Sequence, residues 1–94
     1  MFVQQQPRRF CRADIETINV DQIGVYGIFL QGIWVYIGKG DIRQRLLDHL
    51  NGDNPKILSW KPTHWVAEVI KGDSSMREKQ LIVELNPRCN MRLG

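Results

Sequence analysis

Residues 24–40 form the densest run of strand-forming side chains in the chain, and they constrain the fold more than any other segment. Branched and aromatic residues dominate both halves, with turn-forming residues only at Gln31–Gly32, so the run predicts a β-hairpin. Side chains alternate between strand faces, so Tyr26 and Tyr36 share a face only if paired residue numbers add to an even value. A three-residue loop, Leu30–Gln31–Gly32, with its glycine in the left-handed conformation, satisfies that condition.

The segments after the hairpin alternate between helical and strand patterns. Asp41 has the short acceptor side chain of an N-cap, and apolar residues then recur at helical spacing until a turn-forming run ends the helix. Residues 52–63 are interpreted as a loop with a short helical turn, and His64–Lys71 alternates as a third strand. Gly72–Ser75 caps a second helix, which ends at Pro87. The sequence therefore predicts an α+β fold: a small antiparallel sheet of about three strands covered by helices, in the order β-β-α-β-α.

The length and composition favour one domain. The chain has 94 residues, 43% of them hydrophobic and 24% charged, which is ordinary for a globular protein. Residues 1–21 are interpreted as an N-terminal arm or as a short helix over Phe10–Ile15, and residues 22–94 as the domain itself. Two sets of apolar or long side chains are expected to pack on the core. They are Ile18, Val20 and Ile23 before the hairpin, and Met76, Gln80, Leu81, Val83 and Leu85 in the second helix.

Charge and cysteine content narrow the class of protein only slightly. A net charge of +3 is compatible with an anionic partner but does not require one. Cys11 and Cys89 are too few for a disulfide framework and lack zinc-binding spacing, which indicates reduced thiols in a cytoplasmic protein. The sequence has no signal-peptide pattern and no run of about 18 apolar residues, so no membrane span is expected.

Two tripeptides in the hairpin resemble those that define the GIY-YIG nuclease family. Gly24–Val25–Tyr26 is similar to the first, with valine in place of isoleucine, and Tyr36–Ile37–Gly38 matches the second. Lys39 follows directly, as a lysine often does in the family. The resemblance implies that both tripeptides lie on adjacent strands, that Gly38 has a structural role, and that Lys39 binds substrate.

Later residues extend the resemblance through most of the chain, to Asn90. Arg45 and His49, which lie four apart and therefore on one helix face, are similar to the family's arginine and the histidine or tyrosine after it. Arg43 is the alternative for the arginine and is otherwise assigned to substrate binding. Glu78 stands three residues before a Leu-Ile pair, as the family's glutamate does. Asn90 closes a Pro-x-x-Asn motif and is assigned to structure.

The resemblance implies a metal-dependent DNA endonuclease that leaves 5′-phosphate and 3′-hydroxyl ends. Glu78 would hold Mg²⁺, with Mn²⁺ as the alternative ion. Arg45 would donate two parallel hydrogen bonds to the scissile phosphate. Tyr26 would be the general base if nearby positive charge favoured its ionised form, with Tyr36 or His49 orienting the water or relaying its proton. His49 is the other candidate for the base.

Other interpretations of these residues stay open. A non-catalytic nucleic-acid-binding module with the same fold is one alternative, and a structural or partner-binding domain is another. Ser75–Met76–Arg77–Glu78 also spells a capping box, in which the glutamate would serve only to start the helix. A separate DNA-binding domain does not fit in 94 residues, so specificity would come from substrate shape, a homodimer or a partner protein.

Overall fold

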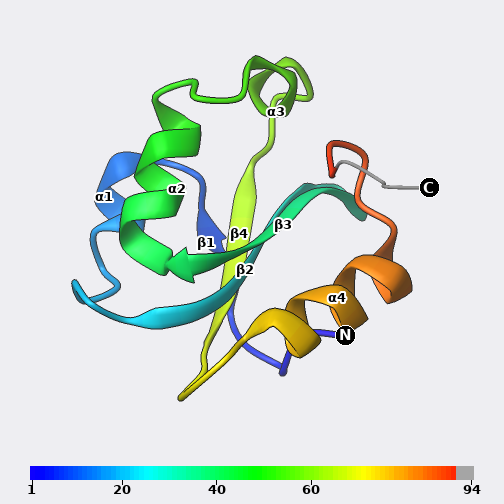
Figure 1. Cartoon of the computed structure of the whole chain (residues 1–94). Coiled ribbons are helices and arrows are strands. Elements are labelled where there is room, and N and C mark those ends of the chain that lie inside the picture. The colour runs from blue at the N-terminus through cyan, green and yellow to red at the C-terminus, as the bar shows by residue number, and fades with distance from the viewer. Residues whose placement is uncertain (91–94) are drawn as a thin grey trace.

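The predicted hairpin is present and lies in a four-stranded antiparallel sheet (Figure 1). The computed structural model describes residues 1–90. The strands are arranged in the order β1-β4-β2-β3. They are β1 (Arg8–Arg9), β2 (Ile23–Leu30), β3 (Ile33–Asp41) and β4 (His64–Val69). The α+β class and the antiparallel sheet are therefore confirmed, whereas the count of about three strands missed β1. That strand is only two residues long, and pairing with the edge of β4 defines it rather than any pattern of its own.

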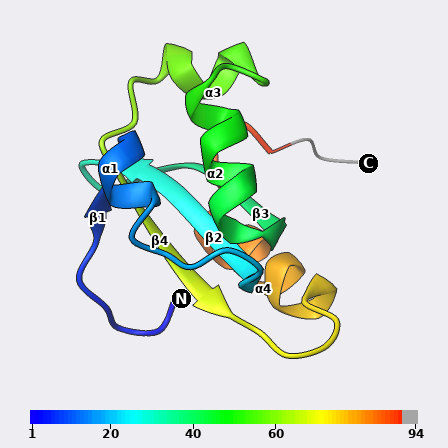
Figure 2. The ribbon, with the colours of Figure 1, turned by 90° about the vertical axis from the view of Figure 1, so that its left-hand side faces the viewer.

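Helices cover both faces of the sheet. They are α1 (Arg12–Ile15), α2 (Ile42–Leu50), α3 (Pro55–Ser59) and α4 (Ser75–Leu85). Asp41 caps α2 as predicted, because its Oδ1 accepts a hydrogen bond of 3.2 Å from the backbone N–H of Gln44. Figures 1 and 2 show α1 and α2 on one side of the sheet and α4 on the other. None of the helices within residues 1–90 is long and apolar enough to cross a membrane.

The hairpin turn differs from the predicted three-residue loop. Leu30 pairs with Ile33, so the loop has only two residues, Gln31 and Gly32, and both have a positive φ (42° and 79°). Such a turn matches the right-handed twist of the strands. A register shift lies between Ile28 and Phe29, and the extra residue on the opposite strand restores the pairing in which Tyr26 and Tyr36 share a face.

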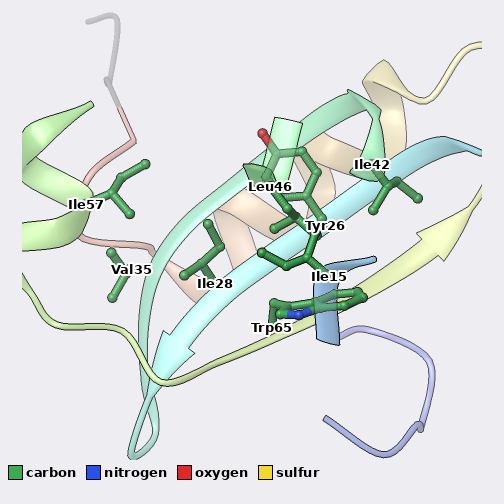
Figure 3. Close-up of a cluster of buried hydrophobic side chains, with 8 residues drawn as sticks. All are labelled: Ile15, Tyr26, Ile28, Val35, Ile42, Leu46, Ile57 and Trp65. Carbon is green, nitrogen blue, oxygen red and sulfur yellow. The ribbon is translucent and has the colours of Figure 1, made fainter. Parts of the chain in front are cut away.

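Two apolar clusters lie on opposite faces of the sheet. We call the face under α1, α2 and α3 the first face and the face under α4 the second face. The buried residues of the first face, drawn in Figure 3, are Ile15, Tyr26, Ile28, Val35, Ile42, Leu46, Ile57 and Trp65. Those of the second face are Phe2, Val25, Ile37, Val66 and Leu81.

Several residues predicted to pack on the core are exposed instead. In α4, Leu81 is buried, but Met76 and Val83 are 79% and 68% exposed. At 100° per residue these two lie about 140–160° around the helix from Leu81, so they face away from the sheet. Val20 and Ile23 are also exposed. Of the three residues predicted to anchor the segment before the hairpin, only Ile18 packs against the first-face cluster. Gln80 is exposed in the same way, and Leu85 packs as expected.

Candidate active site

Tyr26, His49 and Asp53 form a hydrogen-bonded chain on the first face. Oη of Tyr26 lies 2.8 Å from Nε2 of His49, and Nδ1 of His49 lies 2.8 Å from Oδ1 of Asp53. Tyr26 is fully buried and His49 is 2% exposed, whereas the Asp53 side chain is 38% exposed. This series of hydrogen bonds therefore runs from the core to the surface.

The fold holds Tyr26 and His49 on different elements, and Asp53 lies in the turn after the helix of His49. Tyr26 lies on the central strand β2, and Figure 3 shows its ring among apolar side chains with its hydroxyl pointing away from Trp65. His49 lies in the last turn of α2 and continues the buried stripe of Ile42 and Leu46, at spacings of four and three. A histidine at that position must direct its ring towards the sheet, where the phenol is.

Tyr36 and Arg45 complete the cluster around His49. The ring of Tyr36 is 4.9 Å from that of His49, in an edge-on arrangement, and 6.3 Å from that of Tyr26. Arg45 is close enough to both phenols to lower the pKa of each, although burial has the larger, opposite effect. Nη1 of Arg45 lies 3.8 Å from Oδ2 of Asp53. Two phenols, an imidazole, a guanidinium and a carboxylate thus share one small region.

Burial keeps both buried members of the chain neutral near pH 7. It raises the pKa of Tyr26 above its ordinary value of 10.0, and the neighbouring Tyr36 adds to this effect. Burial also lowers the pKa of His49, against the opposing effect of Asp53. An ionised carboxylate only accepts hydrogen bonds, so neutral His49 carries its proton on Nδ1, facing Asp53. Its Nε2 then accepts a hydrogen bond from the Tyr26 hydroxyl. Tyr26 can therefore accept a proton only as it passes its own to His49.

Gly38 makes room for the two phenols. A Cβ at Gly38 would lie 2.3 Å from Oη of Tyr26 and 2.9 Å from a ring carbon of Tyr36. Gly38 is also the partner of Tyr26 across the β2–β3 pair. Any side chain at this position would displace the hydroxyl from its place beside His49.

Glu78 lies at the edge of the sheet, beyond β3. It is half-buried, and among the described residues its carboxylate has no hydrogen bond or ion pair. Burial raises its pKa, and Lys39 partly offsets this. The Glu78 charge in turn raises the pKa of Tyr36, so the carboxylate lies within electrostatic reach of that phenol although α4 covers the second face. Lys39 lies beside it and donates a hydrogen bond to Oγ of Ser75.

The capping-box alternative for Glu78 is not realised. The N-cap of α4 is Ser74 rather than Ser75, and its side chain makes no capping hydrogen bond. The backbone N–H of Ser75 instead donates to Oδ1 of Asp73, at 2.9 Å. The Glu78 carboxylate is thus available for a ligand.

Arg43 and Asn90 lie apart from the phenols. Arg43 faces α1, where its Nη2 lies 3.8 Å from Oε2 of Glu16. Asn90 is bonded to both backbone groups of Ile37, accepting from the N–H at 2.9 Å and donating to the carbonyl at 2.7 Å. Arg43 is therefore outside the cluster that holds Arg45. Asn90 ties the segment after α4 to β3.

Asp53 was not predicted as a site residue from the sequence, where it stands only within the turn-forming run that ends α2. Its spacing of four from His49 was the available signal, but that spacing is informative only if the chain continues to turn after the helix ends. Gly52, with a φ of 91°, provides that turn.

The residues present fit a magnesium ion held mainly by water and substrate. Within residues 1–90, no group of three or more His, Cys, Asp or Glu side chains is arranged to hold a metal. Mg²⁺ commonly binds one or two carboxylates and keeps several waters, which phosphate oxygens can replace. The carboxylate of Glu78, which has no hydrogen-bond or ion-pair partner among residues 1–90 and lies within electrostatic reach of Tyr36, has the chemistry that such an ion needs.

The fold and the site define this molecule only in general terms, as an α+β protein with a Tyr-His-Asp hydrogen-bonded series that runs from the core to the surface, near a guanidinium and a second carboxylate. Comparisons with models of protein families, with curated proteins and with solved structures gave no match to the chain. The function must therefore be inferred from the chemistry of the site residues rather than from the fold.

Proposed function

We propose that this protein is a metal-dependent DNA endonuclease of the GIY-YIG type, which hydrolyses phosphodiester bonds to 5′-phosphate and 3′-hydroxyl ends. The observation that carries the proposal is the clustering of Tyr26, Tyr36, Arg45 and His49 on one side of β3, with Glu78 at its edge. Hydrolysis needs a proton acceptor, positive charge for the phosphoryl oxygens and an oxygen ligand for a metal. This set supplies all three.

Tyr26 and His49 together would act as the general base. As water attacks phosphorus, its proton moves to Oη of Tyr26, and the phenolic proton moves to Nε2 of His49. The bond of 2.8 Å between these atoms supports this direct transfer. The arrangement avoids a free phenolate, which the raised pKa of Tyr26 disfavours. Tyr36, whose ring packs on the edge of His49, would orient the attacking water.

Arg45 and Lys39 would bind the DNA backbone. Arg45 is more than one-third exposed at its side chain, so it can reach a phosphate in solvent while staying beside the phenols. Its planar fork suits two oxygens of the scissile phosphate. Lys39 is exposed on the same edge as Glu78 and would contact a neighbouring phosphate.

Glu78 would hold the metal, with Mg²⁺ as the natural ion and Mn²⁺ as a substitute. When bound, the ion would neutralise charge on the phosphoryl group and the departing 3′ oxygen. Burial of Glu78 matches this role, because a half-buried carboxylate without a partner gains most from a cation.

DNA is the partner that we propose, with a homodimer or a second protein supplying specificity. The net charge of +3 favours a polyanion. We also propose a cytoplasmic location, where the free thiols of Cys11 and Cys89 would stay reduced.

The test is cleavage of supercoiled plasmid and of linear, flapped and branched DNA, with Mg²⁺, with Mn²⁺ and with chelator. Wild-type protein should cut in the presence of metal only, and Tyr26→Phe should lose cleavage while retaining DNA binding. Binding without cleavage of any substrate would favour the non-catalytic module instead. Equal cleavage by Tyr26→Phe would show that the site described here is not responsible.

A further inference from the structure

We propose that Asp53 is a positioning residue of the active site, which holds neutral His49 in the tautomer that can take the Tyr26 proton. This inference rests on the proposed nuclease function. It assigns Asp53 a role that does not require contact with the DNA or with a metal.

The backbone after α2 places the Asp53 carboxylate before any ligand binds. The N–H of Gly52 donates to the carbonyl of His49, and the N–H of Asp53 donates to that of Asp48, both at 3.1 Å. The left-handed φ of Gly52 permits this reversal, which an L-residue would strain. The carboxylate is therefore held at Nδ1 of His49 by the end of the same helix that carries the histidine.

The tautomer of His49 decides whether the proton can move. Which ring nitrogen carries the proton depends on the hydrogen bond that the other nitrogen makes. Asp53 accepts at Nδ1, so Nε2 has a free lone pair facing the phenol. Neutral imidazole in water favours the opposite tautomer, in which Nε2–H would present a donor to Tyr26. Without Asp53, a larger share of the protein would therefore have the wrong tautomer.

Asp53 also faces Arg45, but that contact is not the essential one. Its Oδ1 bonds His49 at 2.8 Å, whereas its Oδ2 lies 3.8 Å from Nη1 of Arg45. Asp48 gives the same guanidinium a second partner at 3.5 Å. Loss of Asp53 should thus affect the histidine more than the arginine.

The charged groups around His49 set the direction of the expected pH effect. From α2 these are Arg45, which lowers its pKa, and Asp48, which raises it. From the strands, Tyr26 and Tyr36 face the ring as neutral phenols. Asp53 raises the pKa of His49, so its removal should lower that pKa further.

The first measurement is ¹⁵N NMR of the histidine ring in protein without DNA or metal. Wild-type His49 should carry its proton on Nδ1 at neutral pH. In Asp53→Ala the His49 tautomer should shift towards Nε2–H. In Asp53→Asn the amide oxygen can still accept a hydrogen bond from Nδ1–H, so more of the original tautomer should remain. Asp21→Asn, at an exposed aspartate in the segment before β2, is the matched control and should leave the His49 signals unchanged.

The second measurement is the pH profile of DNA cleavage with Mg²⁺. Asp53→Ala should cut about 10- to 100-fold more slowly, the scale known for loss of a carboxylate that orients a metal-binding histidine. The cleavage rate should rise with pH as His49 loses its proton. In Asp53→Asn this rise should move to lower pH, because the pKa of His49 is lower without the carboxylate. A residue with only a structural role would lower the rate without moving the profile.

The two proposals fail in different ways. If wild-type protein cuts DNA, but both Asp53 variants keep its rate and profile, the positioning role is wrong and the nuclease function stands. If wild-type protein cuts nothing, the nuclease function is wrong, and the NMR result alone decides whether Asp53 sets the tautomer. An unchanged tautomer in Asp53→Ala overturns the inference in either case.

Discussion

The two faces of the sheet bury similar apolar clusters but differ in how fully their polar side chains are buried. Within residues 1–90, the buried ionisable side chains are Tyr26 and His49, and both lie on the first face. On the second face Phe2 and Trp34 stack with ring centres 5.3 Å apart, and Glu68, whose side chain is 10% exposed, lies 2.8 Å from Nη2 of Arg77 on α4. A buried polar pair is stabilising only when each group has a partner, and here both have one.

Under the proposed function, this difference separates the part of the molecule that would do chemistry from the part that supports it. A hydrogen-bonded pair in the core costs desolvation that an apolar pair would avoid, which is consistent with the functional role that we propose for it. The second face holds α4 against β3 and places Glu78 at the shared edge. We therefore expect substitutions on the first face to change cleavage, and those on the second to change stability alone.

The largest expected effect lies at the boundary between the faces. Glu78→Gln should fold normally and bind DNA but lose metal-dependent cleavage by about 10³-fold or more, because the neutral amide is a poor ligand for Mg²⁺. Glu84→Gln is the control, since Glu84 lies on the exposed side of α4 and binds the N-terminal amine. Plasmid nicking and a DNA-binding assay measure the two properties. Cleavage by Glu78→Gln at the wild-type rate would place the metal elsewhere.

A matched pair of leucines sharpens the comparison of the faces. Leu46 in α2 and Leu81 in α4 are both fully buried, on the first and second face respectively. Truncation of either to alanine should lower the free energy of unfolding by about 2–5 kcal/mol in urea denaturation. At a temperature where both variants are folded, only Leu46→Ala should also cut DNA more slowly, because Leu46 lies between Arg45 and His49 on α2. Equal loss of cleavage in both would contradict the division.

A smaller effect is expected at the arginine. Arg45→Lys keeps the positive charge but loses the planar fork, so cleavage should fall about 10²-fold, the scale seen when one donor to a developing charge is removed. Arg43→Lys should lose less, since Arg43 faces Glu16, the residue that follows α1. Single-turnover rates on one DNA substrate compare the two. A larger loss in Arg43→Lys would move the phosphate-binding role to that residue.

The smallest effect is on the pH dependence of stability. The folded-state pKa of His49 is lowered, so the unfolded chain binds a proton on it first, at a pKa of about 6.5. Stability present above that pH should therefore be lost as the pH falls towards the folded pKa, at up to about 1.4 kcal/mol per pH unit. His49→Gln should flatten this slope, whereas Leu81→Ala should lower stability at every pH. Urea denaturation between pH 7 and 5 measures both, and an unchanged slope in His49→Gln would contradict the prediction.

Much of the local structure could be predicted from the sequence. The hairpin, the α2 cap at Asp41 and the alternation of β4 depend on contacts between near neighbours, so their patterns are visible in a short stretch of residues. The spacing of Arg45 and His49 likewise follows from the helix alone. Packing positions in α4 were only partly predicted, because a mixed apolar pattern does not show which side of a helix meets the sheet.

The sequence by itself determined that Tyr26 and Tyr36 belong to paired strands and that a helix follows them. Only the tertiary structure decided how they meet: a two-residue turn and a register shift at Ile28 and Phe29 replace the expected loop and still bring both phenols to one face. It also decided that Asp53 reaches His49 and that Glu78 has no hydrogen-bond or ion-pair partner among residues 1–90. Such contacts join separate elements, and their geometry depends on the packing of the whole core rather than on any local pattern.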